Sequence, residues 1–383
     1  MQRFLEYARQ KEPELIELIR ELVECESPTG SPAGVNRLID LLVERTRDIA
    51  TAKTVNIDGL GNLLRLEFQV QSSEARGEIL ALGHSDTVWP LGTIGHMPFR
   101  QADGRLWGPG VLDMKSGLAF FLYAVRALIE SEVPVRRRVV LLVVPDEEIG
   151  SKSSRAHTEA EARQSECVLV LEPGTGLTGG LKTSRKGVGL YTVEIEGIAA
   201  HAGVDFESGA SAILEAARQV DRIATFTDLA RGTTVNPGVI SGGTRSNVIA
   251  AQAKIEVDVR VTTATDAGAL DQRLRSLAPV DKRCRIRVEG GLNRPPMERT
   301  RTTACLFDVA RRIGAELGIA VEESSSGGGS DGNFTAALGI PTLDGVGAVG
   351  EGAHAANESI LIHRIADRVA LLAGLLCKLP PAL

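Results

Sequence analysis

Three continuous apolar runs in the first half of the chain end in acidic or histidine residues. They are EILALGHSD (78–86), RRVVLLVVPDEE (137–148) and SECVLVLEPG (165–174). An apolar run without polar alternation is typical of a strand that is buried on both faces of a sheet. A helical pattern at 114–131 separates the first two runs, so strands alternate with helices. We therefore predict an α/β fold whose sheet is at least partly parallel.

The pattern changes after residue 180. The segment GLYTVEIEG (189–197) alternates apolar and polar residues, as in a half-exposed antiparallel strand. It begins a β-α-β-β-α-β order typical of a ferredoxin-like unit. The further elements are a helix at 209–226, strands near 233–242 and 249–261, a helix at 266–278 and a strand at 284–290. After Pro295 and Pro296 the pattern returns to helix, with helices expected at 301–317 and 364–377.

These patterns predict two domains, of which one is discontinuous. Residues 1–179 and 296–383 are expected to form a mixed-sheet domain with helices on both faces, and residues 180–295 an inserted α+β domain. The first 24 residues are expected to form an amphipathic helix with Leu15, Ile19 and Leu22 on one face.

Composition excludes several classes of protein. The net charge is −6 with acids and bases interspersed, which argues against a nucleic-acid partner. No apolar run approaches the roughly 20 residues that a membrane span needs. The N-terminal segment lacks the apolar block of a secretory signal, and the 5 cysteines show no C-x-x-C pairing. We therefore expect a cytoplasmic protein that does not contact membranes.

Residues able to bind metal follow the predicted strands. His84 and Asp86 end the first strand, and their i, i+2 spacing points both to one side. Asp146, Glu147 and Glu148 follow the second strand, where adjacent carboxylates repel one another unless cations neutralise them. A solvated acidic loop is the alternative for these three residues.

Three further residues complete the set. Glu172 ends the third strand, Asp113 precedes the helix at 114–131, and His354 lies in the small-residue loop GEGAHAANE (350–358). Taken singly, Asp113 fits a helix N-cap and His354 fits a surface position. In open α/β sheets, however, ligands gather at the carboxyl ends of strands. Two histidines and three acids suit two adjacent divalent ions as ligands. One further glutamate can act as the base that takes a proton from a water molecule at these ions.

Together, in this order, these motifs resemble those of the zinc-dependent peptidases and deacylases that include glutamate carboxypeptidase, succinyl-diaminopimelate desuccinylase, acetylornithine deacetylase and aminoacylase. The resemblance covers nearly the whole chain and is greatest to glutamate carboxypeptidase. It implies two Zn²⁺ per subunit, although Co²⁺ or Mn²⁺ accept similar ligands. The implied metal ligands are His84, Asp113, Glu148, Glu172 and His354. Asp113 matches the carboxylate that bridges the two ions in this family, and the peptide bond after that residue is often cis.

The same resemblance assigns the catalytic residues. Glu147 matches the general base, and Asp86 matches the acid that supports His84. His201 in GIAAHAG (197–203) matches a histidine that reaches the active site of a neighbouring subunit and stabilises the oxyanion. The inserted domain is the usual dimerisation domain, which implies a homodimer. Without the resemblance, a turn residue beside Gly203 is the preferred interpretation of His201.

Substrate contacts are also implied. Asn247 and Arg260 match residues that hold a free carboxylate, and Gly328 and Gly329 lie in a loop that lines the same pocket. A cross-strand charge pair is the alternative for Arg260. The carboxylate-binding lysine of glutamate carboxypeptidase falls at or near Gly180 here. The nearest basic residues that could replace it are Lys182, Arg185 and Lys186.

The predicted function is therefore hydrolysis of an amide bond in a small peptide or N-acyl amino acid that carries a free carboxylate. A glutamate carboxypeptidase-like exopeptidase is the first interpretation, and an N-acyl amino acid deacylase is the second. A metal-binding protein without turnover is a further alternative, which the presence of Glu147 disfavours. A nucleotide-binding α/β protein is disfavoured because the chain lacks both a P-loop and a strand-linked G-x-G-x-x-G motif.

Overall fold

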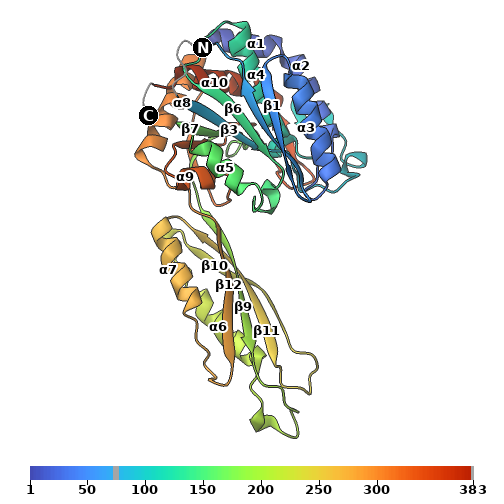
Figure 1. The fold of residues 1–383 in the computed structure, drawn as a ribbon, viewed down its shortest axis with the longest axis vertical. Helices are drawn as coiled ribbons and strands as arrows, with labels where there is room; N and C mark the ends of the chain where they lie inside the picture. The colour runs from blue at the N-terminus through green and yellow to red at the C-terminus, as the bar shows by residue number, and fades with distance from the viewer. Residues whose placement is uncertain (72–76, 381–383) are drawn as a thin grey trace. The chain divides into compact units, whose positions relative to one another are not determined.

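The computed structural model describes residues 1–71 and 77–380, and the chain forms two compact units (Figure 1). The large unit consists of Met1–Ser184, Arg299–Ser326 and Ser330–Leu383. The inserted unit consists of Arg185–Glu298 and Gly327–Gly329. The transitions lie a few residues after the expected ones, because strand β8 (Leu181–Arg185) pairs with the sheet of the large unit.

An eight-stranded mixed sheet forms the centre of the large unit, with the order β1-β2-β6-β3-β7-β14-β8-β13. The four strands β6, β3, β7 and β14 are parallel to one another, whereas β2 and β8 flank them in antiparallel orientation. This confirms the predicted mixed sheet. The remaining bounds are β1 (Ala50–Ile57), β2 (Gly61–Phe68), β3 (Glu78–His84), β6 (Arg138–Val144), β7 (Cys167–Val170), β13 (Glu323–Ser326) and β14 (Thr342–Asp344).

Both faces of this sheet are covered, which explains the continuous apolar runs. Ala81 and Leu141 belong to a core shared with most helices of the unit, while Leu80 and Leu142 belong to a second core with Ala162 of α5. Each fully buried leucine contributes about 1.5–3 kcal/mol relative to an exposed one. The helices of the unit are α1 (Gln2–Gln10), α2 (Glu12–Glu24), α3 (Pro32–Thr46), α4 (Ser116–Glu130), α5 (Arg155–Ala162), α8 (Arg301–Leu317), α9 (Gly332–Ala337) and α10 (Ile365–Lys378).

The N-terminal segment differs from the expected single helix. It forms α1 and α2, which meet at Lys11, where φ is −91° and ψ is 3°. Pro13 follows in the first turn of α2, a position where its missing N–H costs no intrahelical bond. The single-helix prediction was therefore wrong at this point, although the apolar face of α2 is buried as expected.

A small four-stranded sheet, which the sequence did not reveal, adjoins the loop of His354. Its order is β15-β16-β5-β4, and its strands are β4 (Arg100–Ala102), β5 (Arg105–Trp107), β15 (Gly350–Glu351) and β16 (Ser359–Leu361). Strands of two or three residues leave almost no periodic signal in a sequence. The sheet matters because β15 and β16 pair with each other and therefore fix both ends of the loop at 352–358.

The inserted unit has the β-α-β-β-α-β order that the sequence indicated. Its four antiparallel strands lie in the order β10-β11-β9-β12, which is that of a ferredoxin-like sheet. One face, which includes Tyr191, Val193 and Ile255, packs in a core with the two helices. The elements are β9 (Gly187–Glu196), α6 (Ala212–Ala224), β10 (Thr234–Gly242), β11 (Gln252–Val261), α7 (Ala264–Arg275) and β12 (Arg285–Arg294).

Single-turn helices complete the chain: η1 (Thr93–Gly95), η2 (Val111–Lys115), η3 (Glu147–Ile149), η4 (Phe206–Ser208), η5 (Leu229–Arg231) and η6 (Ile362–Arg364). Of the helices within residues 1–71 and 77–380, none combines the length and the apolar character needed to cross a bilayer.

Candidate metal centre

Parallel strands bring the candidate ligands to one edge of the large sheet. Strand β3 ends at His84, β6 leads to Glu147 and Glu148, and β7 leads to Glu172. Because β6, β3 and β7 are adjacent and parallel, their carboxyl ends meet at the same edge. The topology alone therefore gathers side chains that are up to 88 positions apart in the chain, from residue 84 to residue 172.

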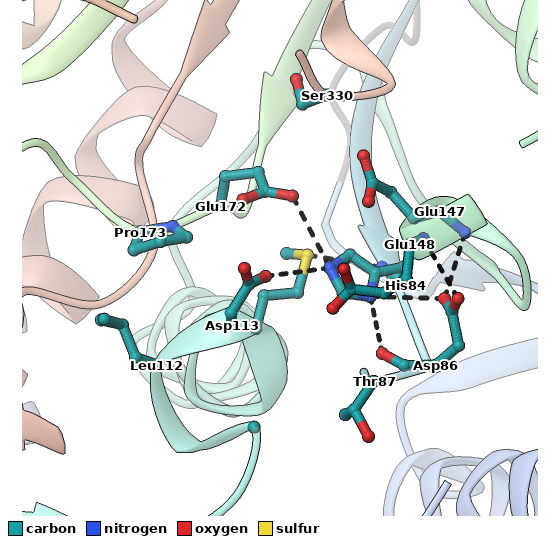
Figure 2. Close-up of polar contacts among 12 residues, drawn as sticks. His84, Asp86, Thr87, Leu112, Asp113, Glu147, Glu148, Glu172, Pro173 and Ser330 are labelled. Carbon is teal, nitrogen blue, oxygen red and sulfur yellow. Dashed lines mark hydrogen bonds and ion pairs between the residues drawn. The ribbon is translucent and has the colours of Figure 1, made fainter. Parts of the chain in front are cut away.

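Two groups of ligand atoms form at this edge. In the first, His84 Nε2 lies 3.1 Å from Asp113 Oδ1 and 3.6 Å from Glu172 Oε1 (Figure 2). In the second, His354 Nε2 lies 3.2 Å from Asp113 Oδ2 and 3.2 Å from Glu148 Oε2. Each group offers ligand atoms within 4.8 Å of one another. Asp113 directs one oxygen to each group, which is the arrangement a bridging carboxylate requires.

The electrostatics of the cluster favour added positive charge. Burial alone would raise the pKa of Asp113, but hydrogen bonds from His354 and His84 hold it well below its usual value. Hydrogen bonds to Asp113 and Glu148 raise the pKa of His354 to about 10. Glu148 Oε1 is buried and has no hydrogen-bond partner among the described residues. The imidazoles and carboxylates of the cluster therefore suit divalent cations as ligands. A bound cation would replace the protons that the histidines share with the carboxylates.

Asp86 supports both His84 and the acidic loop. His84 Nδ1 lies 2.9 Å from the Asp86 carbonyl oxygen and 3.4 Å from Asp86 Oδ1. A proton on Nδ1 directed at these oxygens leaves Nε2 available as the ligand atom. The Asp86 carboxylate also accepts hydrogen bonds of 3.2 Å from the backbone N–H groups of Glu147 and Glu148. Thr29 Oγ1 donates a third, 2.8 Å long.

The three adjacent acids of the loop have separate environments. Glu147 and Glu148 lie in η3, and Figure 2 shows Glu147 beside the ligand cluster. Of these three acids, Glu148 alone belongs to one of the two ligand groups found among the described residues. Asp146 is fully buried and accepts hydrogen bonds from the backbone N–H groups of Ser153 and Ser154. Asp146 thus fixes the loop, which leaves Glu147 as the half-buried acid next to the cluster.

Two backbone features shape the ligand segments. The peptide bond between Asp113 and Met114 is cis, as the family resemblance implied. His354 has φ of 61°, a left-handed conformation that costs a non-glycine residue roughly 1–3 kcal/mol. Gly352 in the same loop has φ of 84°, and a Cβ there would lie 2.7 Å from the Asn357 carbonyl oxygen.

The sequence did not single out Glu358, which contacts the Asp113 segment. Its carboxylate is fully buried and accepts hydrogen bonds from the backbone N–H groups of Leu112 and Asp113. The available signal was an acid four residues after His354, directly before strand β16. That signal is weak because a single acid beside a short strand is common.

Candidate residues of the inserted unit lie on its surface or in local pairs. His201 is exposed, and its Nδ1 accepts a hydrogen bond of 3.2 Å from Gly203 N. The backbone beside it bonds to the Asn247 carbonyl through Ala202 N. Arg260 forms a bidentate ion pair with Asp258, with both bonds at 2.9 Å. The pairing that the sequence left as an alternative for Arg260 is thus present, although within one strand.

The nearby basic residues bond to backbone oxygens. Lys182 Nζ donates to the Pro173 carbonyl at 2.7 Å and lies 3.7 Å from Asp344 Oδ1. Arg185 donates to the carbonyls of Gly328 and Gly329, which group with the inserted unit. These contacts engage Lys182 and Arg185, two of the three basic residues that the sequence suggested as substitutes for a carboxylate-binding lysine.

An α/β sheet with this set of imidazole and carboxylate ligands at its carboxyl edge has the features of a metal-dependent hydrolase. The model of peptidase family M20/M25/M40 matches residues 80–378. The chain therefore belongs to this family, and it is an enzyme of the metallopeptidase type.

Individual relatives agree with that assignment. Carboxypeptidase G2 of Pseudomonas sp. (strain RS-16) is 29% identical over 381 residues, covering 97% of this chain and 91% of the relative. A succinyl-diaminopimelate desuccinylase of Dechloromonas aromatica (strain RCB) is 28% identical, covering 96% of this chain and 99% of the relative. The solved structure of aminopeptidase PepT from Bacillus cereus ATCC 10987 has the same fold. Its TM-score is 0.79 at 23% identity, with 95% of this chain and 98% of that chain covered.

Proposed function

We propose that this chain is a two-zinc hydrolase that cleaves an amide bond in a small substrate with a free carboxylate, as a glutamate carboxypeptidase-like exopeptidase. The observation that supports it is Asp113, whose two oxygens face two separate histidine-containing groups. His84 and Glu172 would complete the site of one ion, and His354 and Glu148 that of the other.

The proposed mechanism assigns each residue a role. When bound, two divalent ions would polarise the scissile carbonyl and make water a nucleophile at neutral pH. Glu147 takes a proton from the attacking water and returns it to the leaving amine. Asp86 fixes the orientation of His84 and the backbone of Glu147 through the bonds described above. His201 of a second copy of the chain stabilises the developing oxyanion.

The proposed recognition of the substrate depends on its carboxylate. Asn247, Arg260 and the backbone of Gly328 and Gly329 are the proposed contacts, and the guanidinium of Arg260 suits a planar carboxylate. Since Arg260 already pairs with Asp258, the substrate would compete with that carboxylate or add to it. Similarity to carboxypeptidase G2 over nearly the full chain supports this choice of substrate class.

Deacylation of an N-acyl amino acid is the second candidate, supported by the full-length similarity to a desuccinylase. The two reactions differ in the side of the amide that is recognised. A panel of peptidyl- and pteroyl-glutamates against N-acetyl and N-succinyl amino acids separates them. We expect the highest kcat/KM on a substrate with a C-terminal glutamate, and a clear preference for N-succinyl substrates would overturn that choice.

A homodimer in the cytoplasm is part of the proposal. All five cysteines are free thiols, which agrees with a reducing compartment. The inserted unit exposes large apolar side chains on strand β10 and helix α6: Val239 54%, Ile240 55%, Ile213 46% and Leu214 49%. Burial of such side chains in a second copy would stabilise a dimer. Light scattering coupled to size-exclusion chromatography tests this, and a monomer at micromolar concentration would contradict it.

The base assignment has a direct test. Glu147→Ala should keep two metal ions per subunit while kcat falls by roughly 10²–10⁴-fold or more, because proton transfer loses its acceptor. Metal content by plasma mass spectrometry and kcat on the best substrate are measured together. A variant that retains wild-type turnover would overturn the role of Glu147, and one that loses its metals would make Glu147 a ligand instead.

A further inference from the structure

Glu358 stands out among the buried acids of the large unit because its partners belong to one turn of backbone and one indole. Its side chain is fully buried, and no salt bridge neutralises it among residues 1–71 and 77–380. A buried carboxylate is costly unless hydrogen bonds compensate for its lost hydration. The residue therefore requires several well-placed donors.

Four donors meet this requirement. Glu358 Oε1 accepts from Leu112 N at 2.9 Å and from Asp113 N at 3.1 Å. Glu358 Oε2 accepts from Gly110 N at 2.9 Å and from Trp89 Nε1 at 2.8 Å. Three of the four donors belong to the backbone that leads into the proposed bridging ligand.

The backbone held in this way lacks the regular bonds of a helix. Asp113 has φ of −115° and ψ of 94°, and Met114 has φ of −133° and ψ of 32°, so both lie outside helical values. A turn of this kind leaves N–H groups without carbonyl partners in the preceding turn. The Glu358 carboxylate accepts these hydrogen bonds instead. It thereby fixes the position of the backbone from which the Asp113 side chain extends.

Glu358 also connects two proposed ligands. It ends the loop that carries His354, and its own N–H donates to the Ala355 carbonyl at 2.9 Å. The residue that follows, Ser359, begins strand β16 and is buried. The same side chain thus joins the His354 loop to the Asp113 turn, and these two segments supply two of the three residues of the second ligand group.

We propose that Glu358 is a positioning residue that sets the spacing between Asp113 and His354 and thereby the metal affinity of the site. This inference rests on the proposed two-metal function. Glu358 itself touches neither the substrate nor the ions in this proposal, and it acts through the backbone of Asp113.

Glu358→Gln is the principal test. The variant keeps the size of the side chain but replaces one oxygen by an NH₂ group, which then faces N–H donors in either orientation. We expect the dissociation constant of at least one Zn²⁺ per subunit to rise by roughly 10–100-fold, as for other outer partners of metal ligands. Competition with a chromophoric chelator measures the constants, and the visible absorption of the Co²⁺-substituted protein should change as well.

Glu26→Gln provides a matched control. Glu26 also accepts two backbone hydrogen bonds of 2.9 Å, from Gly92 N and Ile94 N, but it does not bond to the Asp113 turn. We expect wild-type metal affinity for this variant. Trp89→Phe removes only the indole donor to Glu358, so its metal affinity should weaken by roughly 2–10-fold, less than that of Glu358→Gln.

The outcomes separate the two proposals. A folded Glu358→Gln protein with wild-type Zn²⁺ affinity would overturn the positioning role while the metal centre stands. A wild-type protein that binds no Zn²⁺ would overturn the metal centre itself. If Glu358→Gln does not fold, as circular dichroism would show, Trp89→Phe decides the question, and unchanged affinity in that variant would overturn the positioning role.

Discussion

The two sheets of this protein bury their strands to different degrees. In the large unit, the central strands β3 and β6 are mainly apolar and are buried on both faces. The exceptions are the buried Glu78 and His84 at the two ends of β3 and the exposed Arg138 at the start of β6. In the inserted unit, β9 and β11 alternate between buried residues and residues that contact solvent. Only the first arrangement can hold several carboxylates in a site of low dielectric constant at the ends of its strands.

The candidate functional residues of the two units differ in burial in the same way as the two sheets. In the large unit, His84 and Asp86 are almost completely buried. His84 Nε2 lies 3.1 Å from Asp113 Oδ1, and Asp86 accepts hydrogen bonds from Thr29 and from the Glu147 N–H, so contacts come from segments far apart in the chain. In the inserted unit, His201 is exposed and Arg260 bonds to Asp258, its near neighbour in the same strand. Packing therefore fixes the proposed metal ligands, whereas the proposed substrate contacts depend on short-range pairing.

The largest effect is expected from Asp113→Asn, which tests the buried side of the comparison. Loss of the shared negative charge should weaken both ion sites, and kcat/KM should fall by roughly 10³-fold or more, which is about 4 kcal/mol of transition-state stabilisation. Metal stoichiometry and turnover are measured together. Retention of two tightly bound ions would show that the two groups do not share Asp113.

The next effect concerns packing of the two sheets. Leu141 of β6 is fully buried, and Leu141→Ala should lower the free energy of unfolding by about 2–5 kcal/mol. Leu190 of β9 is 57% exposed, and Leu190→Ala should change it by no more than about 0.5 kcal/mol. Urea denaturation followed by circular dichroism provides both values. A large cost for Leu190→Ala would reveal a partner that covers this face of the inserted sheet.

A smaller effect is expected from Glu215, a buried acid of the inserted unit. It accepts hydrogen bonds from Gln219 Nε2 at 2.7 Å, Val280 N at 2.9 Å and Asp281 N at 3.0 Å. Glu215→Gln should lower the free energy of unfolding at neutral pH by about 1–3 kcal/mol. Glu256→Gln, which alters an exposed ion pair with Lys254, should cost less than this and serves as the control.

The pH dependence of Glu215 has a defined sign. Burial alone would raise its pKa, but hydrogen bonds from Asp281, Gln219 and Val280 lower it below the usual value. A carboxyl group with a lowered pKa in the folded state stabilises the fold above its unfolded pKa of about 4.3 and loses this contribution as the pH falls through the folded pKa. The difference in stability between wild type and Glu215→Gln should therefore shrink in acid. A difference that grows below pH 4 would contradict this assignment.

Much of the fold could be predicted because its signals are local. The unbroken apolar runs identified β3, β6 and β7, and alternation identified β9. Other elements escaped prediction: the longer α3 and β1, the short strands of the small sheet, and the break between α1 and α2 at Lys11. A strand of two or three residues is defined by its partner strand, so its own sequence contains too little information.

The candidate site, like the fold, was predictable from the sequence only in part. The sequence by itself determined which side chains end the buried strands, because the alternation of strand and helix places those ends at one edge of a sheet. Only the tertiary structure decided how the two oxygens of Asp113, the bridging residue that the resemblance implied, face different histidines. It also decided that Glu358 holds the turn of Asp113, 245 positions earlier in the chain. These contacts depend on the packing of segments whose separation in sequence leaves no periodic trace, and hydrogen-bond geometry is fixed only when that packing is complete.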